Sequence, residues 1–161
     1  MIVPTLQALA DEDVLIVATT GVQPVESLKL AQYPTNARIE PFIPHSQLLP
    51  HVDVMVTNGG YNGVQMALAN GVPLVAAGQT EDKPEVCARI DWSGVGINLK
   101  TKTPTPAQIK NAVKKILSSP QYRQNAERMK ADICHYDAPT ISATLLEQLA
   151  ATKQPVLRIN Q

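Results

Sequence analysis

The stretch Val54-Met55-Val56-Thr57-Asn58-Gly59-Gly60-Tyr61-Asn62-Gly63-Val64 decides the fold. Residues 54–57 are apolar or β-branched, which is typical of a parallel strand covered on both faces. A pair of glycines follows at once, and apolar residues then recur with helical spacing as far as Ala69. The stretch therefore predicts a buried strand, a glycine turn and a helix over about 62–69.

The start of this helix has the chemistry of an anion site. In the first turn, the N–H groups around Asn62, Gly63 and Val64 would lack intrahelical acceptors, and the glycines Gly59 and Gly60 would let a ligand approach the main chain. Asn58 and Asn62 add uncharged donors. A helix start at the carboxyl end of a parallel strand is where diphosphates bind in doubly wound folds. A tight turn without a ligand is the alternative, because the pattern is neither G-x-G-x-x-G nor a P-loop.

The remaining sequence alternates short β-branched runs with helical stretches, which predicts an α/β, Rossmann-like three-layer domain with a mainly parallel sheet. Predicted strands cover 14–18, 37–42, 54–57, 73–77 and 95–99, and predicted helices cover 3–10, 25–31, 46–49, 62–69, 83–92, 106–118, a stretch after Pro120, and 137–150. We expect one domain over residues 1–151 and a tail over 152–161. A βαβ sheet normally begins with a strand, so the opening helix suggests a missing first strand and a longer parent polypeptide.

Composition excludes several classes of protein. The 161 residues are 44% hydrophobic and 17% charged, with 14 Lys+Arg against 14 Asp+Glu, so neither disorder nor a dedicated nucleic-acid binder is expected. No apolar run approaches the roughly 18 residues that span a bilayer. The first residues lack the layout of a secretory signal, which indicates a cytoplasmic protein. Cys87 and Cys134 lie far apart without a CxxC pair, and we expect both to be buried free thiols.

Charge is distributed unevenly along the chain. Residues 1–99 carry ten acidic and four basic residues, a net charge of −6, and residues 100–161 carry ten basic and four acidic residues, a net charge of +6. The lysines of 106–118 fall opposite its apolar residues, so a solvated helix face is favoured over a membrane or polyanion site.

Two further segments follow predicted strand ends. Phe42-Ile43-Pro44-His45 comes after the second strand, and Gln79-Thr80-Glu81-Asp82-Lys83 comes after the fourth. Because parallel strands end at the same edge of a sheet, an aromatic side chain, a glycine turn and a polar cluster would lie in a row there. Such a row would suit a base, a diphosphate and a sugar.

With these motifs in this order, the chain resembles the donor-binding, C-terminal half of GT-B glycosyltransferases of the UDP-glycosyltransferase and macrolide-glycosyltransferase type. The resemblance covers about residues 6–149 and implies a nucleotide-sugar donor, either a UDP-sugar or a dTDP-sugar, no cofactor and no metal. It assigns the residues of the site in three groups. The diphosphate would contact Asn58, Gly59, Gly60, Asn62, Gly63 and Val64; the nucleobase and ribose would contact Phe42, Ile43, His45 and Gln65; and the sugar would contact Glu81, Asp82 and Lys83.

The sequence departs from the family pattern at several positions, among them His45, which replaces a glutamine, and Gly63, which stands where the family has a serine or threonine. Asn58 stands where the family has a histidine, Met66 stands where a glutamate holds the ribose, and Lys83 replaces a glutamine. The identities of the base and the sugar therefore stay open.

The resemblance also implies partners. The acceptor pocket and the catalytic base would come from a missing N-terminal domain or from a separate subunit, and this chain would carry no catalytic residue. The expected function is donor binding for transfer of a hexose or deoxyhexose to a small-molecule or lipid acceptor. The alternative is a non-catalytic subunit of a split glycosyltransferase that docks a separate partner. A third alternative, a sugar-nucleotide epimerase of the GT-B type, would need acidic catalytic residues, for which we find no candidates in this sequence. A homodimer could form through the exposed first-strand edge.

Other candidate residues have simpler interpretations. Asp11-Glu12-Asp13 resembles a metal-binding triplet but precedes its strand, so a polar turn is favoured. His51 and Asp53 could pair, but they lie at the amino end of a strand, and ligands of such sheets bind at the other end. Trp92 is expected to anchor its helix in the core.

Overall fold

The computed structural model describes residues 1–157, and within them five parallel strands form two sheets. In the first sheet, β1 (Ile16–Thr19) pairs with β2 (Ala37–Glu40). In the second, β4 (Leu74–Ala76) lies between β3 (Met55–Thr57) and β5 (Gly96–Asn98). All five predicted strands are confirmed. The strands are parallel throughout, as predicted, but within the described residues β1 and β3 share no ladder, so they belong to two separate sheets.

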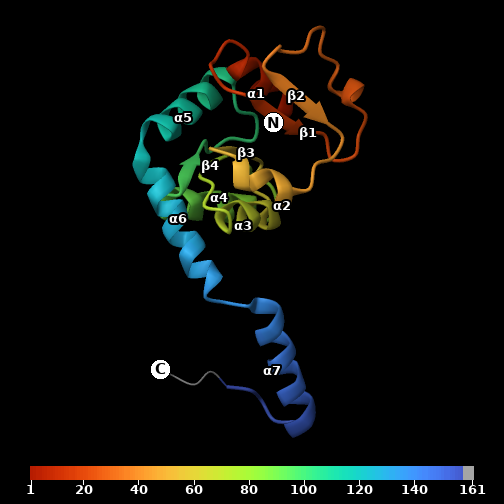
Figure 1. Cartoon of the computed structure of the whole chain (residues 1–161), viewed down its shortest axis with the longest axis vertical. Helices are drawn as coiled ribbons and strands as arrows, with labels where there is room; N and C mark the ends of the chain where they lie inside the picture. Colours follow the sequence, from red (N-terminus) through yellow and green to blue (C-terminus); the bar gives the residue numbers. More distant parts are fainter. Residues whose placement is uncertain (158–161) are drawn as a thin grey trace.

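Helices cover both faces of the second sheet and extend beyond it (Figure 1). Residues ahead of β3 form α1 (Ile2–Leu9), the short 3-10 helix η1 (Val25–Leu28), α2 (His45–Leu48) and η2 (Leu49–His51). The remaining helices are α3 (Tyr61–Leu68), α4 (Lys83–Trp92), α5 (Pro106–Ser118), α6 (Pro120–Cys134) and α7 (Ala138–Thr152).

Strand β4 separates two hydrophobic cores. Leu74 and Ala76 are fully buried on one face among residues of α3 and α4, whereas Val75 is fully buried on the other face with residues of α1 and α5. Successive side chains of a strand point to opposite faces, so both faces of β4 must be apolar. Three layers, helix, sheet and helix, result from this arrangement.

Helix α5 forms as the sequence predicts. The Thr105 side chain accepts a hydrogen bond from the Gln108 N–H at 3.3 Å, and the Gln108 side chain accepts one from the Thr105 N–H at 2.9 Å, which is a capping box. Ile109 and Val113 are buried with residues of α1, whereas Lys110 and Lys114 are partly exposed, at 41% and 56%. The solvated lysine face is thus confirmed, and its lysines pair with Glu12.

The C-terminal helix α7 stands apart from the α/β body (Figure 1). Asp137 caps its start by accepting a hydrogen bond from the Thr140 N–H at 3.2 Å. The helix ends at Thr152, the first residue of the predicted tail, and residues 158–161 of that tail lie outside the described residues. None of its residues is buried. No helix within residues 1–157 is both long and apolar enough to cross a membrane.

Two expectations about burial are wrong. Trp92 is 90% exposed, because it ends α4 on the side away from Val86, Cys87 and Ile90, which face the core. Cys134 is exposed at the end of α6, whereas Cys87 is buried as expected.

Candidate functional site

The glycine turn connects β3 to α3 as the sequence predicts. Gly60 is the N-cap of α3 and no side chain caps the helix. Among the hydrogen bonds within residues 1–157, none has the N–H of Tyr61, Asn62 or Gly63 as donor. The Val64 N–H, in contrast, donates to the Gly60 carbonyl at 3.1 Å, and the Val64 side chain is buried. The expectation of a free Val64 N–H is therefore wrong: the helix starts at Tyr61, one residue earlier than predicted, and its free donors shift with it.

Gly59 holds the turn in a conformation that only glycine adopts without strain. Its φ angle is +79°, and its N–H donates to the Thr57 Oγ1 atom at 3.2 Å. The next N–H, of Gly60, donates to the Asn58 Oδ1 atom at 3.2 Å. These two bonds fix the turn without using the three N–H groups of the first helical turn, which remain available to a ligand.

The turn that follows β4 lies directly against the glycine turn. A Cβ atom on Gly78 would overlap the Asn58 carbonyl oxygen, so this close approach requires glycine. The same Cβ atom would lie 2.8 Å from the Cβ of Lys83, and Cys87 packs behind Gly59. The structure thus brings together the segments predicted to bind the diphosphate and the sugar.

The polar cluster that follows β4 consists of an ion pair and two neighbours. The Lys83 ammonium pairs with the Glu81 carboxylate and lies 3.5 Å from the Thr80 hydroxyl oxygen. The hydrogen bond from Lys83 and its charge lower the pKa of Glu81, which therefore stays ionised near neutrality. Asp82 is the N-cap of α4, but its side chain makes no capping hydrogen bond. The Glu81 and Asp82 side chains are exposed, so both carboxylates can accept hydrogen bonds from a ligand.

Three of the residues predicted to contact the base and ribose, Phe42, Ile43 and His45, lie after β2 of the first sheet, and the fourth, Gln65, lies on α3. Phe42 is 65% exposed in the loop, and Ile43 is half-buried. His45 begins α2 and lines a cavity between β1 and β3. Gln65 and Met66 are exposed on α3. Within the described residues, Phe42, Ile43 and His45 form no hydrogen bond with the glycine turn. That they belong to one site with it stays a prediction.

Two further candidates, the acidic triplet and Asp53, have structural explanations. Glu12 bonds the ammonium groups of Lys110, at 2.5 Å, and Lys114, at 2.8 Å, which accounts for the acidic triplet as a link between the α1–β1 turn and α5. Both hydrogen bonds lower the pKa of Glu12. Within residues 1–157, no group of three His, Cys, Asp or Glu residues is placed to hold a metal ion. Asp53 lies 3.5 Å from Arg123.

Arg123 is a structural residue that the sequence did not reveal. From α6, its guanidinium donates to the carbonyl oxygens of Gly71 at 2.9 Å, Val52 at 3.1 Å and Asp53 at 3.1 Å. It therefore joins α6 to the segments at both ends of the β3–α3 unit. The sequence around Arg123 is typical of an exposed helix face. It does not indicate that the side chain bonds carbonyls 52 and 71 residues away along the chain.

A parallel α/β sheet with free N–H groups where a helix leaves β3 defines the class of Rossmann-like nucleotide-binding domains. Solved structures narrow the class to the GT-B glycosyltransferase fold. The glycosyltransferase of kitacinnamycin matches 90% of this chain and 38% of its own, with a TM-score of 0.80 and 26% identity. The calicheamicin glycosyltransferase CalG4 matches 94% of this chain and 38% of its own, with a TM-score of 0.78 and 27% identity.

The chain belongs to the family described as the erythromycin biosynthesis protein CIII-like C-terminal domain, whose model matches residues 4–149. The predicted family resemblance and fold class are confirmed. Among named relatives, the 4'-demethylrebeccamycin synthase of Lentzea aerocolonigenes is 49% identical over 92% of this chain. The UDP-glycosyltransferase 2 of Phaeomoniella chlamydospora is 42% identical over 94%. The chain spans 34% of the length of each of these two relatives.

Proposed function

We propose that this domain binds the diphosphate of a nucleotide-sugar donor on behalf of a glycosyltransferase that acts on a small-molecule or lipid acceptor. The observation that carries the proposal is the free first turn of α3, where the N–H groups of Tyr61, Asn62 and Gly63 have no protein acceptor among residues 1–157. These donors and the helix dipole favour an anion.

The chemistry follows from the same donors. When the bond between the sugar and the diphosphate breaks, negative charge builds up on the leaving oxygen. Main-chain N–H groups already fixed in position stabilise that charge without reorganisation, and they need no metal to do so. The Gly59 and Gly60 hydrogen bonds supply this rigidity. We propose no catalytic base on this chain; the base and the acceptor pocket would come from another domain or subunit.

The turn that follows β4 would hold the sugar. Glu81 and Asp82 present exposed carboxylates beside the glycine turn, and carboxylates accept hydrogen bonds from sugar hydroxyls. Phe42, with its exposed ring, would stack on the base, assisted by Ile43, His45 and Gln65.

The names of similar proteins support two alternatives for the donor nucleotide, UDP and dTDP. The Phaeomoniella protein is named a UDP-glycosyltransferase, and the structure of the glycosyltransferase VinC, 25% identical to this chain with a TM-score of 0.71, was solved with dTDP. We propose that the donor is a UDP-sugar or a dTDP-sugar carrying a hexose or a deoxyhexose. A cytoplasmic location and independence from cofactors stay predictions.

Calorimetry with UDP, dTDP, UMP and uridine tests the proposal. Both diphosphates should bind, UMP more weakly and uridine more weakly still, because the site is built for the diphosphate. Absence of heat and of thermal shift with millimolar UDP and dTDP would overturn it.

A variant with an added negative charge in the first turn of α3 tests the same proposal. Asn62→Asp places a carboxylate in the first turn of α3, which favours the helix dipole but repels a diphosphate. We expect the Kd for UDP or dTDP to rise at least about 5-fold while the Tm holds or increases, because two like charges at close range repel by about 1 kcal/mol even in water. Gln124→Glu, on the exposed side of α6, adds the same charge elsewhere and should leave the Kd unchanged.

A further inference from the structure

The turn that follows β4, residues 78–83 (the Lys83 turn), contains one cation, and that cation is already paired. The Lys83 ammonium bonds the Glu81 carboxylate and lies 3.5 Å from the Thr80 hydroxyl oxygen. The Lys83 side chain is only 17% exposed, whereas the Glu81 side chain is 73% exposed. The positive charge is therefore largely withdrawn from solvent and is neutralised by a carboxylate that remains accessible.

The aliphatic part of Lys83 lies where this turn meets the glycine turn. A Cβ atom on Gly78 would come within 2.8 Å of the Lys83 Cβ and 3.2 Å of its Cδ. A Cβ atom on Gly59 would lie 3.8 Å from the same Lys83 Cβ. The lysine side chain thus passes over Gly78, beside the turn that we propose to bind the diphosphate. A sugar joined to that diphosphate would meet the charges of the Lys83 turn at short range.

The backbone of the turn brings Glu81 and Lys83 together. The Lys83 N–H donates to the Thr80 carbonyl at 3.2 Å, which closes a tight turn around the two residues between them. Glu81 has a φ angle of +58°, in the left-handed region that residues with a side chain seldom adopt. The conformation costs free energy, and the ion pair two residues along the chain offsets part of that cost. Glu81 is therefore held at the lysine by both its backbone and its charge.

The remaining charge of the turn belongs to Asp82. Its side chain is exposed, makes no capping hydrogen bond and forms no ion pair within residues 1–157. Two acidic residues and one basic residue give the Lys83 turn a net charge of −1. Glu85, on the following helix, pairs with Arg89 at 2.6 Å and so adds no net charge. A negatively charged ligand group would therefore be repelled at this turn, with its one cation already occupied.

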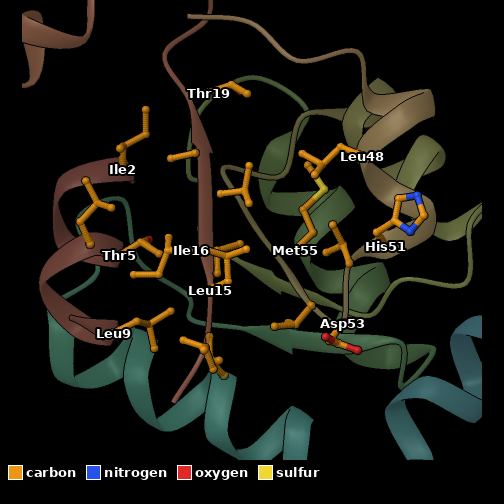
Figure 2. Close-up of a pocket in the computed structure, with 18 of the residues that line it drawn as sticks. Ile2, Thr5, Leu9, Leu15, Ile16, Thr19, Leu48, His51, Asp53 and Met55 are labelled. Carbon is orange, nitrogen blue, oxygen red and sulfur yellow. The ribbon is translucent and has the colours of Figure 1, made fainter. Parts of the chain in front are cut away.

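The large cavity between β1 and β3 does not enclose this turn. Its volume is about 730 Å³, and α1, β1, α2, η2 and β3 contribute most of its mainly aliphatic lining (Figure 2). Residues 78–83 are not part of that lining. The Lys83 turn is instead exposed over residues 79–82. On this chain, the turn can therefore select a sugar by charge and hydrogen bonding rather than by surrounding it.

We propose that Glu81 is a specificity-determining residue: by pairing with Lys83, it makes the turn accept a sugar without an acidic group and reject a uronic acid. The proposal rests on the proposed function, because the sugar meets this turn only when its diphosphate is bound at α3. The carboxylate of a uronic acid would have to displace Glu81 from Lys83 or lie unpaired near two other carboxylates. The hydroxyls of a neutral hexose or deoxyhexose donate to Glu81 and Asp82 as they stand.

Two donors of nearly equal shape test the proposal. UDP-glucose and UDP-glucuronate differ at one carbon, where a carboxylate replaces a hydroxymethyl group. Calorimetry on the intact chain at neutral pH measures the Kd of each donor and of UDP; if the chain binds dTDP but not UDP, the corresponding thymidine pair is used. We expect UDP-glucuronate to bind at least about 5-fold more weakly than UDP-glucose, as one close pair of like charges predicts even in water. High salt should narrow this ratio.

Variants of the ion pair should move the ratio of the two Kd values in opposite directions. Glu81→Gln leaves Lys83 free to bind a carboxylate, so the ratio should fall to about one or reverse. Lys83→Met leaves two carboxylates without a cation, so the ratio should rise. Glu81→Gly repeats the first change with a residue that adopts the φ of +58° without strain, which keeps the turn folded. Glu85→Gln is the matched control and should leave the ratio unchanged, because its carboxylate pairs with Arg89.

Three results would overturn the proposal. One is that the unmodified chain binds both donors equally or prefers UDP-glucuronate. Another is that the ratio stays the same in both Glu81 variants and in Lys83→Met, since selection would then have a different cause. The third is that Glu85→Gln lowers the ratio as much as Glu81→Gln does. If neither UDP nor dTDP binds, the proposed function itself is wrong and this proposal is wrong with it.

Discussion

The Sγ atom of Cys87 lies 2.5 Å from the position that a Cβ atom on Gly59 would take. The buried thiol on α4 therefore fills the space behind the glycine turn, and the first turn of α3 is aligned by a contact with a different helix. This contact links the packing of the core to the proposed diphosphate site, so the first variants should be made here.

Gly59→Ala should destabilise the chain by about 2–4 kcal/mol. The φ angle of +79° costs a residue with a side chain free energy, and the new methyl group must displace the thiol. Chemical denaturation measures the loss. Gly63→Ala is the matched control, because its Cβ would meet only Met55 at 3.7 Å; there the helix should gain about 0.5–1 kcal/mol. A Gly59→Ala variant as stable as the unmodified chain would contradict the geometry of the turn.

The thiol of Cys87 should make stability fall at alkaline pH. Burial raises the pKa of Cys87, while a backbone hydrogen bond from Gly78 partly opposes it. With the folded pKa above the unfolded one, near 8.5, the unfolded chain loses its proton first. Stability is therefore complete below about pH 8.5 and declines as the pH rises further. Denaturation between pH 7 and pH 10 measures this slope, and Cys87→Ala should flatten it. An equally steep slope in the variant would exclude the thiol as its source.

Glu12 should stabilise the link to α5 above the ordinary pKa of a carboxyl group. Its pKa is lowered by Lys110 and Lys114, so the contribution is present near neutral pH and is lost as the pH falls toward and below 4. We expect Glu12→Gln to lower the Tm slightly at pH 7 and not at pH 3, with the difference shrinking in 1 M NaCl. Asp13→Asn, next in the chain and exposed, should have no such pattern. An effect of Glu12→Gln that persists at pH 3 would point to packing rather than charge.

Arg123→Ala should cost about 1–3 kcal/mol, because three main-chain carbonyls lose a charged donor and part of that loss is recovered from water at this half-exposed site. Arg123→Lys should restore only part of it, since an ammonium cannot reproduce the planar fork. Arg128→Ala, also on α6, is the control: within residues 1–157 the Arg128 side chain bonds only Asn125, at 3.3 Å, so its loss should change the unfolding free energy by under ~0.5 kcal/mol. Equal losses in the two alanine variants would remove the special role of Arg123.

Trp92 should report an aqueous environment in the folded chain. It is the single tryptophan and is 90% exposed, so acrylamide should quench its fluorescence nearly as well in the folded as in the unfolded state. Trp92→Ala should change the unfolding free energy by no more than ~0.5 kcal/mol. Strong protection from acrylamide would restore the core position that the sequence led us to expect.

The sequence predicts those features of the structure that depend on residues close together along the chain. The apolar run of 54–57, the glycine pair after it and the Thr105 cap each determine a local conformation, and the strand, the turn and the helix over 106–118 form where expected. The start of α3 is off by one residue, and this moves the free donor from Val64 to Tyr61, because Gly60 takes the N-cap position that periodicity cannot locate.

What the sequence does not predict depends on residues far apart. The exposure of Trp92 and Cys134 is set by which helix face meets the core, and the bonds of Arg123 reach carbonyls up to 71 residues away. The break between β1 and β3 is likewise a matter of which edges meet, since each strand by itself reads as a normal buried parallel strand.

The packing of α1 against α5 has a consequence for biosynthesis. Leu6 and Leu9, near the amino end, are buried with Ile109 and Val113, about a hundred residues later. As the chain leaves the ribosome, α1 thus has no permanent surface to cover it until α5 has emerged. Helix α1 therefore settles only after α5 has been made, and factors that bind nascent chains have that interval in which to shield it.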